Sequence, residues 1–233
     1  LATYCRQYFC IFFIFFLFEF YKKMKFYEFV KLFFICVLTS IPVLAYTYLF
    51  PELITEQHIG LQFINYFLLG NASMISVYII PLILFNLYEK NIKISKLNLI
   101  ISLLTLVLIF IIYFGFDYRK DWLGGGVIYA FSRKILDNDL IFLFSVFTSY
   151  FFLMLICIEN KKYIPLFVAL ILVFFSFQVY QRYYEPMFFL IIFSLVKSKY
   201  ISFIFNEKKY CLILFLYYLI YYLGCTLDIV YKI

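Results

Sequence analysis

Long apolar runs separated by short polar segments make up most of the 233-residue chain. An α-helix of about 20 apolar residues is long enough to cross the hydrocarbon core of a bilayer. The runs are continuously apolar and do not alternate with polar residues, so they favour helices over the tilted strands of a membrane barrel. Eight spanning segments are predicted, over residues 8–20, 29–50, 61–88, 99–116, 140–158, 163–180, 187–196 and 211–227.

The composition supports a membrane class. Hydrophobic residues make up 67% of the chain and charged residues 14%, whereas a soluble domain is roughly half apolar and a quarter charged. We therefore expect an all-α integral membrane protein with about eight transmembrane helices, forming a single polytopic domain over residues 1–233. The 34 Phe and 24 Tyr are weak evidence for an aromatic binding site, because AT-rich codons encode both residues. The chain begins at Leu1 with an apolar run close behind it, and we expect it to be clipped from a longer one.

The positive charges indicate a topology. Of the 20 lysine and arginine residues, 13 fall at every other connection, around residues 22–31, 90–96, 161–162 and 197–209. The positive-inside rule makes this set cytoplasmic. Both termini are then extracytoplasmic, and the expected location is a bacterial inner membrane. Because the net charge of +7 follows from this topology, nucleic acid is not an expected partner. Membrane lipid is expected, and other membrane proteins are partners to consider.

The four arginines depart from the lysine pattern. Arg6, Arg119, Arg133 and Arg182 all fall in the segments assigned to the outer side. A guanidinium group presents a planar fork of donors that suits phosphate or carboxylate. Two explanations stay open and carry equal weight: salt bridges to Asp117, Asp121 or Glu185, or an anionic ligand.

The longest polar stretch, residues 117–139, is predicted to contain a short amphipathic helix in the outer interface. From Gly126 onward, Val127, Ile128, Phe131 and Ile135 recur at helical spacing. Glycines 124–126 come just before this helix and leave backbone N–H groups free to donate hydrogen bonds to an anion. This pattern predicts a phosphate or pyrophosphate site, with side chains from Arg119, Lys120, Trp122, Arg133 and Lys134. The alternative is a flexible hinge with Trp122 as an interfacial anchor.

A second candidate segment is the turn over residues 181–186. The apolar run that follows it, 187–196, is too short to cross a bilayer, so either residues 182–186 or residues 197–200 must be drawn toward the membrane. In the first case Arg182 and Glu185 lie inside the bundle, where ionisable residues are costly and usually functional. Tyr183 and Tyr184 are then placed to line a sugar or lipid path.

The remaining polar residues indicate structure more than chemistry. Five of them on the third apolar run, Gln62, Asn65, Asn71, Ser73 and Ser76, favour helix packing over substrate contact. The chain has one histidine, so it offers no histidine cluster for a metal. No phosphate-binding loop, dinucleotide fingerprint or nucleophile elbow occurs, and no cofactor is expected.

The eight-span pattern, the outer amphipathic helix and the Arg182–Pro186 turn together resemble the multi-spanning glycosyltransferases of the GT-C type and, more distantly, membrane proteins of bacterial surface-polysaccharide synthesis. The resemblance implies transfer of a sugar from a polyprenyl-phosphate carrier at the extracytoplasmic face. Such chemistry needs cations for the departing phosphate and a carboxylate for the acceptor hydroxyl. Arg119, Arg133 and Arg182 fit the first role, and Asp117 or Asp121 is the candidate for the second.

The alternative is a non-catalytic transporter of lipid-linked glycans or an accessory membrane subunit. A transporter is expected to show broken spans or ionisable groups at mid-membrane.

Overall fold

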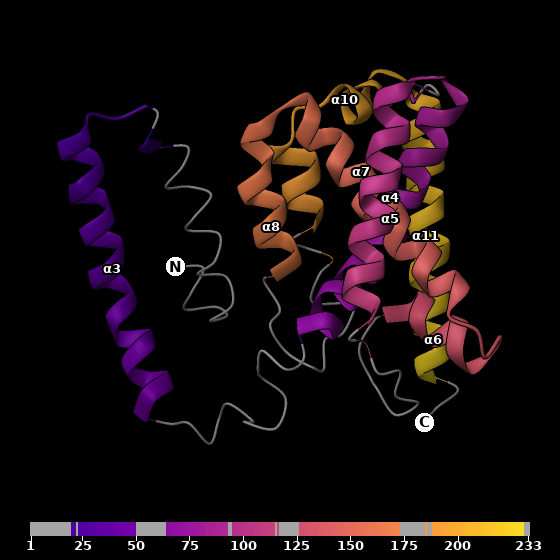
Figure 1. The fold of residues 1–233 in the computed structure, drawn as a ribbon, viewed down its shortest axis with the longest axis horizontal. Helices are drawn as coiled ribbons and strands as arrows, with labels where there is room; N and C mark the ends of the chain where they lie inside the picture. The colour runs from indigo at the N-terminus through magenta and orange to yellow at the C-terminus, as the bar shows by residue number, and fades with distance from the viewer. Residues whose placement is uncertain are drawn as a thin grey trace.

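The computed structural model describes residues 20–21, 23–49, 64–92, 95–114, 116, 126–172, 185 and 188–230 (Figure 1). Within these residues the regular structure is helical throughout and contains no strand, so the all-α class is confirmed. The elements are α3 (Phe26–Leu49), α4 (Ile64–Tyr88), α5 (Lys96–Phe114), α6 (Gly126–Lys134), α7 (Leu140–Glu159), the 3₁₀ turn η5 (Lys161–Tyr163), α8 (Ile164–Leu172), the π-helical turn η6 (Ile191–Leu195), α10 (Lys199–Asn206) and α11 (Lys208–Val230).

Three described helices, α4, α5 and α7, are long and apolar enough to cross a membrane. A fourth crossing is added if the segments Phe188–Leu195 and Lys199–Asn206 are counted as one broken span. The predicted run at 8–20 lies outside the described residues except for Phe20, and the run at 163–180 is described only as far as Leu172. Membrane-spanning character is therefore supported, and eight crossings stay a prediction.

Helix α4 forms the centre of the bundle. It packs against α5, α6, α7 and α8, and it also contacts α10 and α11. Its small residues allow α7 to approach closely: the Ser145 hydroxyl donates to the Ser73 hydroxyl at 3.1 Å, and the Ser149 hydroxyl donates to the Ala72 carbonyl at 2.6 Å. Close approach through small residues is a common basis of helix association in membranes.

The same bonds confirm the packing interpretation of the polar residues on α4. The Asn71 side-chain amide donates to the Ile171 carbonyl of α8 at 2.6 Å, and the Ser76 hydroxyl donates to the Ser73 carbonyl of its own helix at 2.6 Å. Asn86, near the end of α4, donates to the Tyr200 carbonyl of α10 at 2.8 Å. The Asn71 and Asn86 bonds join α4 to other helices, whereas the Ser76 bond lies within α4. Gln62 lies outside the described residues.

The apolar run at 187–196 does not continue as a straight span. It passes through η6, leaves the helical conformation at Val196, and bends by 85° into α10. Ser198 caps α10 by accepting from the Tyr200 N–H at 3.2 Å. Residues 197–200 thus turn away from the axis of the run and do not lengthen it. Within the turn at 182–186, the structure describes Glu185.

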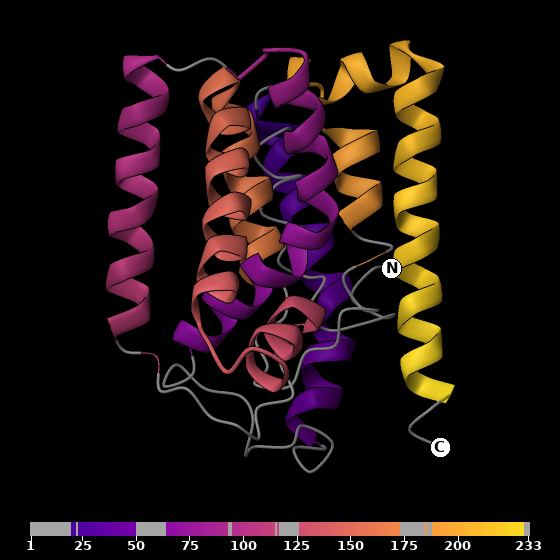
Figure 2. The ribbon, with the colours of Figure 1, turned by 90° about the vertical axis from the view of Figure 1, so that its right-hand side faces the viewer.

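Several lysine-bearing connections lie at one end of the bundle and are joined there by side-chain contacts. We call this the lysine-rich end; it comprises residues 89–92, 159–163, 197–199 and 207–210. Glu159 accepts from the Ser198 hydroxyl and from the Lys199 N–H at 3.1 Å. Glu89 accepts from the Tyr210 hydroxyl and lies 3.8 Å from the Lys209 ammonium. Helix α6 lies at the opposite end (Figures 1 and 2). Three of the four connections predicted to share a side of the membrane therefore lie at one end of the fold.

Helix α3 stands apart from the other described helices (Figure 1). The helix pairs in close contact do not include it, and large apolar side chains such as Phe34 and Leu38 are exposed along it. The packed part of the described chain therefore runs from α4 to α11.

Candidate functional site

The predicted site residues divide into three groups. Eight of them lie outside the described residues: Asp117, Arg119, Lys120, Asp121, Trp122, Arg182, Tyr183 and Tyr184. Arg133 and Lys134 end helix α6, where the backbone is described and their side chains are not. Glu185 is described together with its side-chain contact. The structure thus bears on α6 and on Glu185.

The predicted amphipathic helix is present as α6. It begins at Gly126, whose φ of 75° lies in the left-handed region that glycine adopts without strain. Val127 and Phe131 are exposed, as expected for a helix that meets the membrane interface. Tyr129 and Ser132 are buried on the opposite face. Helix α6 therefore packs on α4 and α7 as well as presenting an apolar surface.

Ser132 fixes the end of α6 relative to α7. Its hydroxyl donates to the Asn138 carbonyl, and the Asn138 N–H donates back to the Ser132 carbonyl at 3.1 Å. This pair closes the short connection between α6 and α7. The two cationic residues at the end of α6, Arg133 and Lys134, are therefore attached to a rigid part of the bundle.

Glu185 lies against the middle of α4. The Tyr78 hydroxyl donates to Glu185 Oε1 at 3.1 Å. Tyr78 is 1% exposed and precedes the end of α4 by ten residues, or about 15 Å at about 1.5 Å per residue. Side chains on a helix lean toward its N-terminus, which for α4 is the end that carries α6. This lean brings the contact close to the midpoint of α4, where the Glu185 side chain is half-buried.

Aromatic rings surround this contact. The Tyr78 ring lies 5.1 Å from the ring of Phe188, 5.3 Å from Phe189, and 6.1 Å from both Tyr218 and Tyr221. We call Tyr78, Phe188, Phe189, Tyr218 and Tyr221 the aromatic cluster. It joins α4, α11 and the segment that begins η6. The rings thus form an apolar border on the Tyr78 side of the half-buried Glu185 side chain.

Two tyrosines of α11 donate hydrogen bonds to backbone carbonyls of α4 at this level. Pro81 has no N–H, so it cannot donate to the Val77 carbonyl one turn earlier. The Tyr217 hydroxyl donates to that carbonyl at 2.8 Å, and the Tyr218 hydroxyl donates to the Tyr78 carbonyl at 2.9 Å. In a bilayer the freed carbonyl needs a partner from the protein itself. Pro81 thus explains why α11 presents tyrosines to α4 beside Glu185.

A second carboxylate lies at the α6 end of the bundle. Asp139 precedes α7, and its Oδ2 accepts from the Tyr113 hydroxyl at 2.8 Å. Its Oδ1 is buried and has no hydrogen-bond donor among the described residues. No group of three histidine, cysteine, aspartate or glutamate side chains gathers into a metal-binding cluster in the described part of the chain.

Sequence reasoning included Glu185 and missed its surroundings. The aromatic residues received little weight because the composition is rich in Phe and Tyr throughout, and Asp139 was one acid among several in a polar loop. The useful signal was Pro81: a proline inside a membrane helix requires a donor from a neighbouring helix. That signal does not identify which helix supplies it.

The chain matches no protein-family model, no curated protein and no solved structure.

Proposed function

We propose that this protein is a membrane glycosyltransferase that takes a sugar from a polyprenyl-phosphate carrier on the extracytoplasmic side. The observation that carries the proposal is the contact between Tyr78 and Glu185. It holds Glu185 against the middle of α4, and an ionisable residue within a membrane domain is costly and usually functional. The α6 end, which holds Arg133 and Asp139, is the side from which the substrate enters.

Glu185 supplies the carboxylate that transfer requires. The acceptor hydroxyl attacks the anomeric carbon of the sugar, and the bond from that carbon to the carrier phosphate breaks. The hydroxyl proton passes to Glu185 Oε2, while Tyr78 holds Oε1 in place. The electron pair of the broken bond leaves with the polyprenyl phosphate. We assign this role to Glu185 in place of Asp117 or Asp121 because the Tyr78 hydroxyl orients its carboxylate.

The arginines stabilise the departing phosphate. Arg182 precedes Glu185 by three residues, so the two side chains can lie on one face of a helical turn. Arg133, on the anchored end of α6, and Arg119 are the other candidates, with Lys120, Trp122 and Lys134 beside them. Tyr183 and Tyr184 line the sugar or lipid path. A preorganised cation is most effective where charge develops in the transition state.

A transporter of lipid-linked glycans is the second candidate, and two observations favour it. The chain breaks by 85° between Phe188–Leu195 and Lys199–Asn206, and Glu185 lies near the middle of α4. Broken helices and midplane ionisable groups are typical of secondary transporters. In this function Glu185 and Tyr78 bind the glycan hydroxyls, and no bond is broken.

The two functions differ in their products. The full chain is reconstituted in vesicles with a polyprenyl-phosphate-linked sugar and an acceptor glycan, and two quantities are followed: release of polyprenyl phosphate, and movement of intact lipid-linked sugar between leaflets. The variants are Glu185→Gln and Arg182→Ala. Glu89→Gln is the matched control, because Glu89 also accepts from a tyrosine hydroxyl but lies at the lysine-rich end.

A transferase releases polyprenyl phosphate, and loss of a general base lowers turnover by about 10²-fold to 10⁴-fold in Glu185→Gln. Glu89→Gln stays within a few-fold of wild type. Movement of intact lipid-linked sugar without phosphate release would establish the transporter. Equal activity of Glu185→Gln, Arg182→Ala and wild type in both assays would reject the proposed site.

A further inference from the structure

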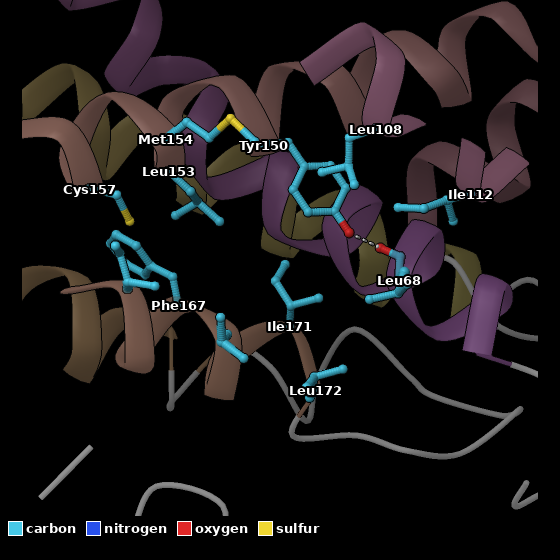
Figure 3. A pocket seen from close by; sticks show the side chains of 12 residues that line it. Leu68, Leu108, Ile112, Tyr150, Leu153, Met154, Cys157, Phe167, Ile171 and Leu172 are labelled. Carbon is cyan, nitrogen blue, oxygen red and sulfur yellow. Dashed lines mark hydrogen bonds between the residues drawn. The ribbon is translucent and has the colours of Figure 1, made fainter. Parts of the chain in front are cut away.

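An apolar groove lies between α5, α7 and α8, and Glu185 is not among the residues that line it (Figure 3). Its volume is about 430 Å³, within the range of about 300–1,000 Å³ typical of ligand pockets. An apolar cavity of about 150 Å³ already holds a benzene molecule in another protein. The groove is therefore large enough for a substantial apolar ligand.

The groove runs along the helix axes. On α7 its lining extends from Tyr150 to Cys157, and on α8 it extends from Ile164 to Leu172. At about 1.5 Å per residue these stretches measure about 10–12 Å. Since α7 is long and apolar enough to cross a membrane, the long dimension of the groove lies along the membrane normal, which is the direction of lipid chains.

The groove is lined almost entirely by apolar side chains. The one hydroxyl in its lining belongs to Tyr150, and it donates to the Leu68 carbonyl at 2.9 Å (Figure 3). Ile164 and Val168, which line α8, are 46% and 50% exposed, so the groove is open on the flank of the bundle. An occupant from the hydrocarbon core of the bilayer fits this lining.

Cations mark one end of the groove. Lys161, Ile164, Val168 and Leu172 follow one another at spacings of three and four residues through η5 and α8, and therefore lie on one helical face. Lys161, the first residue of this stripe, carries a positive charge. The other three residues line the groove. Lys162 lies beside it, with its ammonium 4.9 Å from the centre of the Tyr163 ring. The nearby Glu159 carboxylate already accepts from Ser198 and from the Lys199 N–H.

We propose that this groove is a binding site for an anionic phospholipid of the leaflet that meets the lysine-rich end. One acyl chain lies in the groove along α7 and α8, and the headgroup phosphate lies at Lys161 and Lys162. Charge at the headgroup and apolar area along the chain both contribute to such binding. The site is separate from Glu185 and does not depend on the proposed function.

The test uses the full chain, delipidated in mild detergent and titrated with phosphatidylglycerol or with phosphatidylcholine of the same acyl chains. Native mass spectrometry counts the lipids bound. Val168→Trp fills the groove, and Leu104→Trp places the same side chain on an exposed position of α5. Lys161→Gln removes the cation at the head of the groove, and Lys208→Gln removes an exposed lysine elsewhere at the lysine-rich end.

Wild type is expected to bind one phosphatidylglycerol more tightly than phosphatidylcholine. Val168→Trp weakens both lipids, whereas Lys161→Gln weakens phosphatidylglycerol alone by about fivefold. Leu104→Trp and Lys208→Gln leave binding unchanged. As a measurement independent of folding in the variants, phosphatidylglycerol with a photoreactive group midway along one acyl chain crosslinks wild type within residues 150–157 and 164–172.

Three results would overturn the site. The first is equal binding of the two lipids by wild type, and the second is crosslinking confined to other helices. The third is displacement of phosphatidylglycerol by an equimolar amount of polyprenyl phosphate, which would assign the groove to a prenyl chain instead.

Discussion

Helices α4 and α5 are both continuous apolar helices of spanning length, yet they occupy opposite environments. Buried residues make up 78% of the most apolar stretch of α4 and 22% of that of α5. The buried residues of α5 form a narrow stripe, Ile101, Thr105, Ile109 and Ile112. The central helix is also the one that carries Gly70, Asn71, Ser73 and Ser76.

The difference shows how small polar residues select the central helix. Lipid tails are as apolar as leucine, so apolar character does not draw one membrane helix toward another. Residues that permit close approach or bond across helices do so, and α4 has them while α5 has few. Glu185 and the aromatic cluster gather around α4 for the same reason. The comparison therefore predicts unequal effects of equivalent substitutions on the two helices.

The largest difference is expected for a matched pair of leucine truncations. Leu69 on α4 is 0% exposed, whereas Leu104 on α5 is 59% exposed. Leu69→Ala leaves a cavity in the packed centre and lowers the free energy of unfolding by about 2–5 kcal/mol. Leu104→Ala is expected to lower it by less than about 1 kcal/mol, because lipid chains fill the space. Unfolding in detergent mixtures, followed by circular dichroism, measures both, and equal losses would contradict the central position of α4.

A smaller effect is expected at the proline of α4. Tyr217→Phe removes the donor to the Val77 carbonyl and should lower the free energy of unfolding by about 1 kcal/mol. Pro81→Ala restores an N–H that can donate to the same carbonyl. In the Pro81→Ala background Tyr217→Phe should therefore cost much less. The same unfolding measurement on the two single variants and the double variant gives the coupling, and additive costs would show that Tyr217 does not compensate for Pro81.

The smallest effect separates hydrogen bonds between helices from those within a helix. The Ser149 hydroxyl of α7 donates to the Ala72 carbonyl of α4 at 2.6 Å, whereas the Ser102 hydroxyl donates to the Asn98 carbonyl of its own helix α5 at 2.9 Å. Ser149→Ala should cost about 0.6 kcal/mol of unfolding free energy, and Ser102→Ala should cost nothing measurable. A larger loss in Ser102→Ala than in Ser149→Ala would argue against this ranking.

The helical class, the positions of most apolar runs and helix α6 followed from the sequence, because apolar length and periodicity depend on local residues alone. From the short run at 187–196 the sequence left two alternatives open, and one of them placed Glu185 inside the bundle. It did not predict the bend at Val196–Ser198, since that bend depends on Glu159 from α7 holding the start of α10.

Partners across helices were the part that local patterns could not provide. Tyr78, Tyr217 and Tyr218 stand in a chain with 24 tyrosines, and nothing in their spacing distinguishes them from tyrosines at an interface. Their roles depend on Pro81 and on the contact between α4 and α11 in the folded bundle. Pairing of this kind depends on the tertiary arrangement, as does the choice of Glu185 over Asp117 and Asp121 for the proposed chemistry.

The most direct measurement is the depth of residue 185 in the membrane. A spin label is attached through Glu185→Cys in a chain whose six native cysteines are replaced, and its collisions with oxygen and with a water-soluble nickel chelate are compared. Asp139→Cys provides a reference at the α6 end, and Leu104→Cys a reference on the exposed flank of α5. The account predicts that the label at 185 is shielded from the chelate relative to the label at 139. Equal access of the chelate to 185 and 139 would contradict a Glu185 carboxylate held inside the bundle.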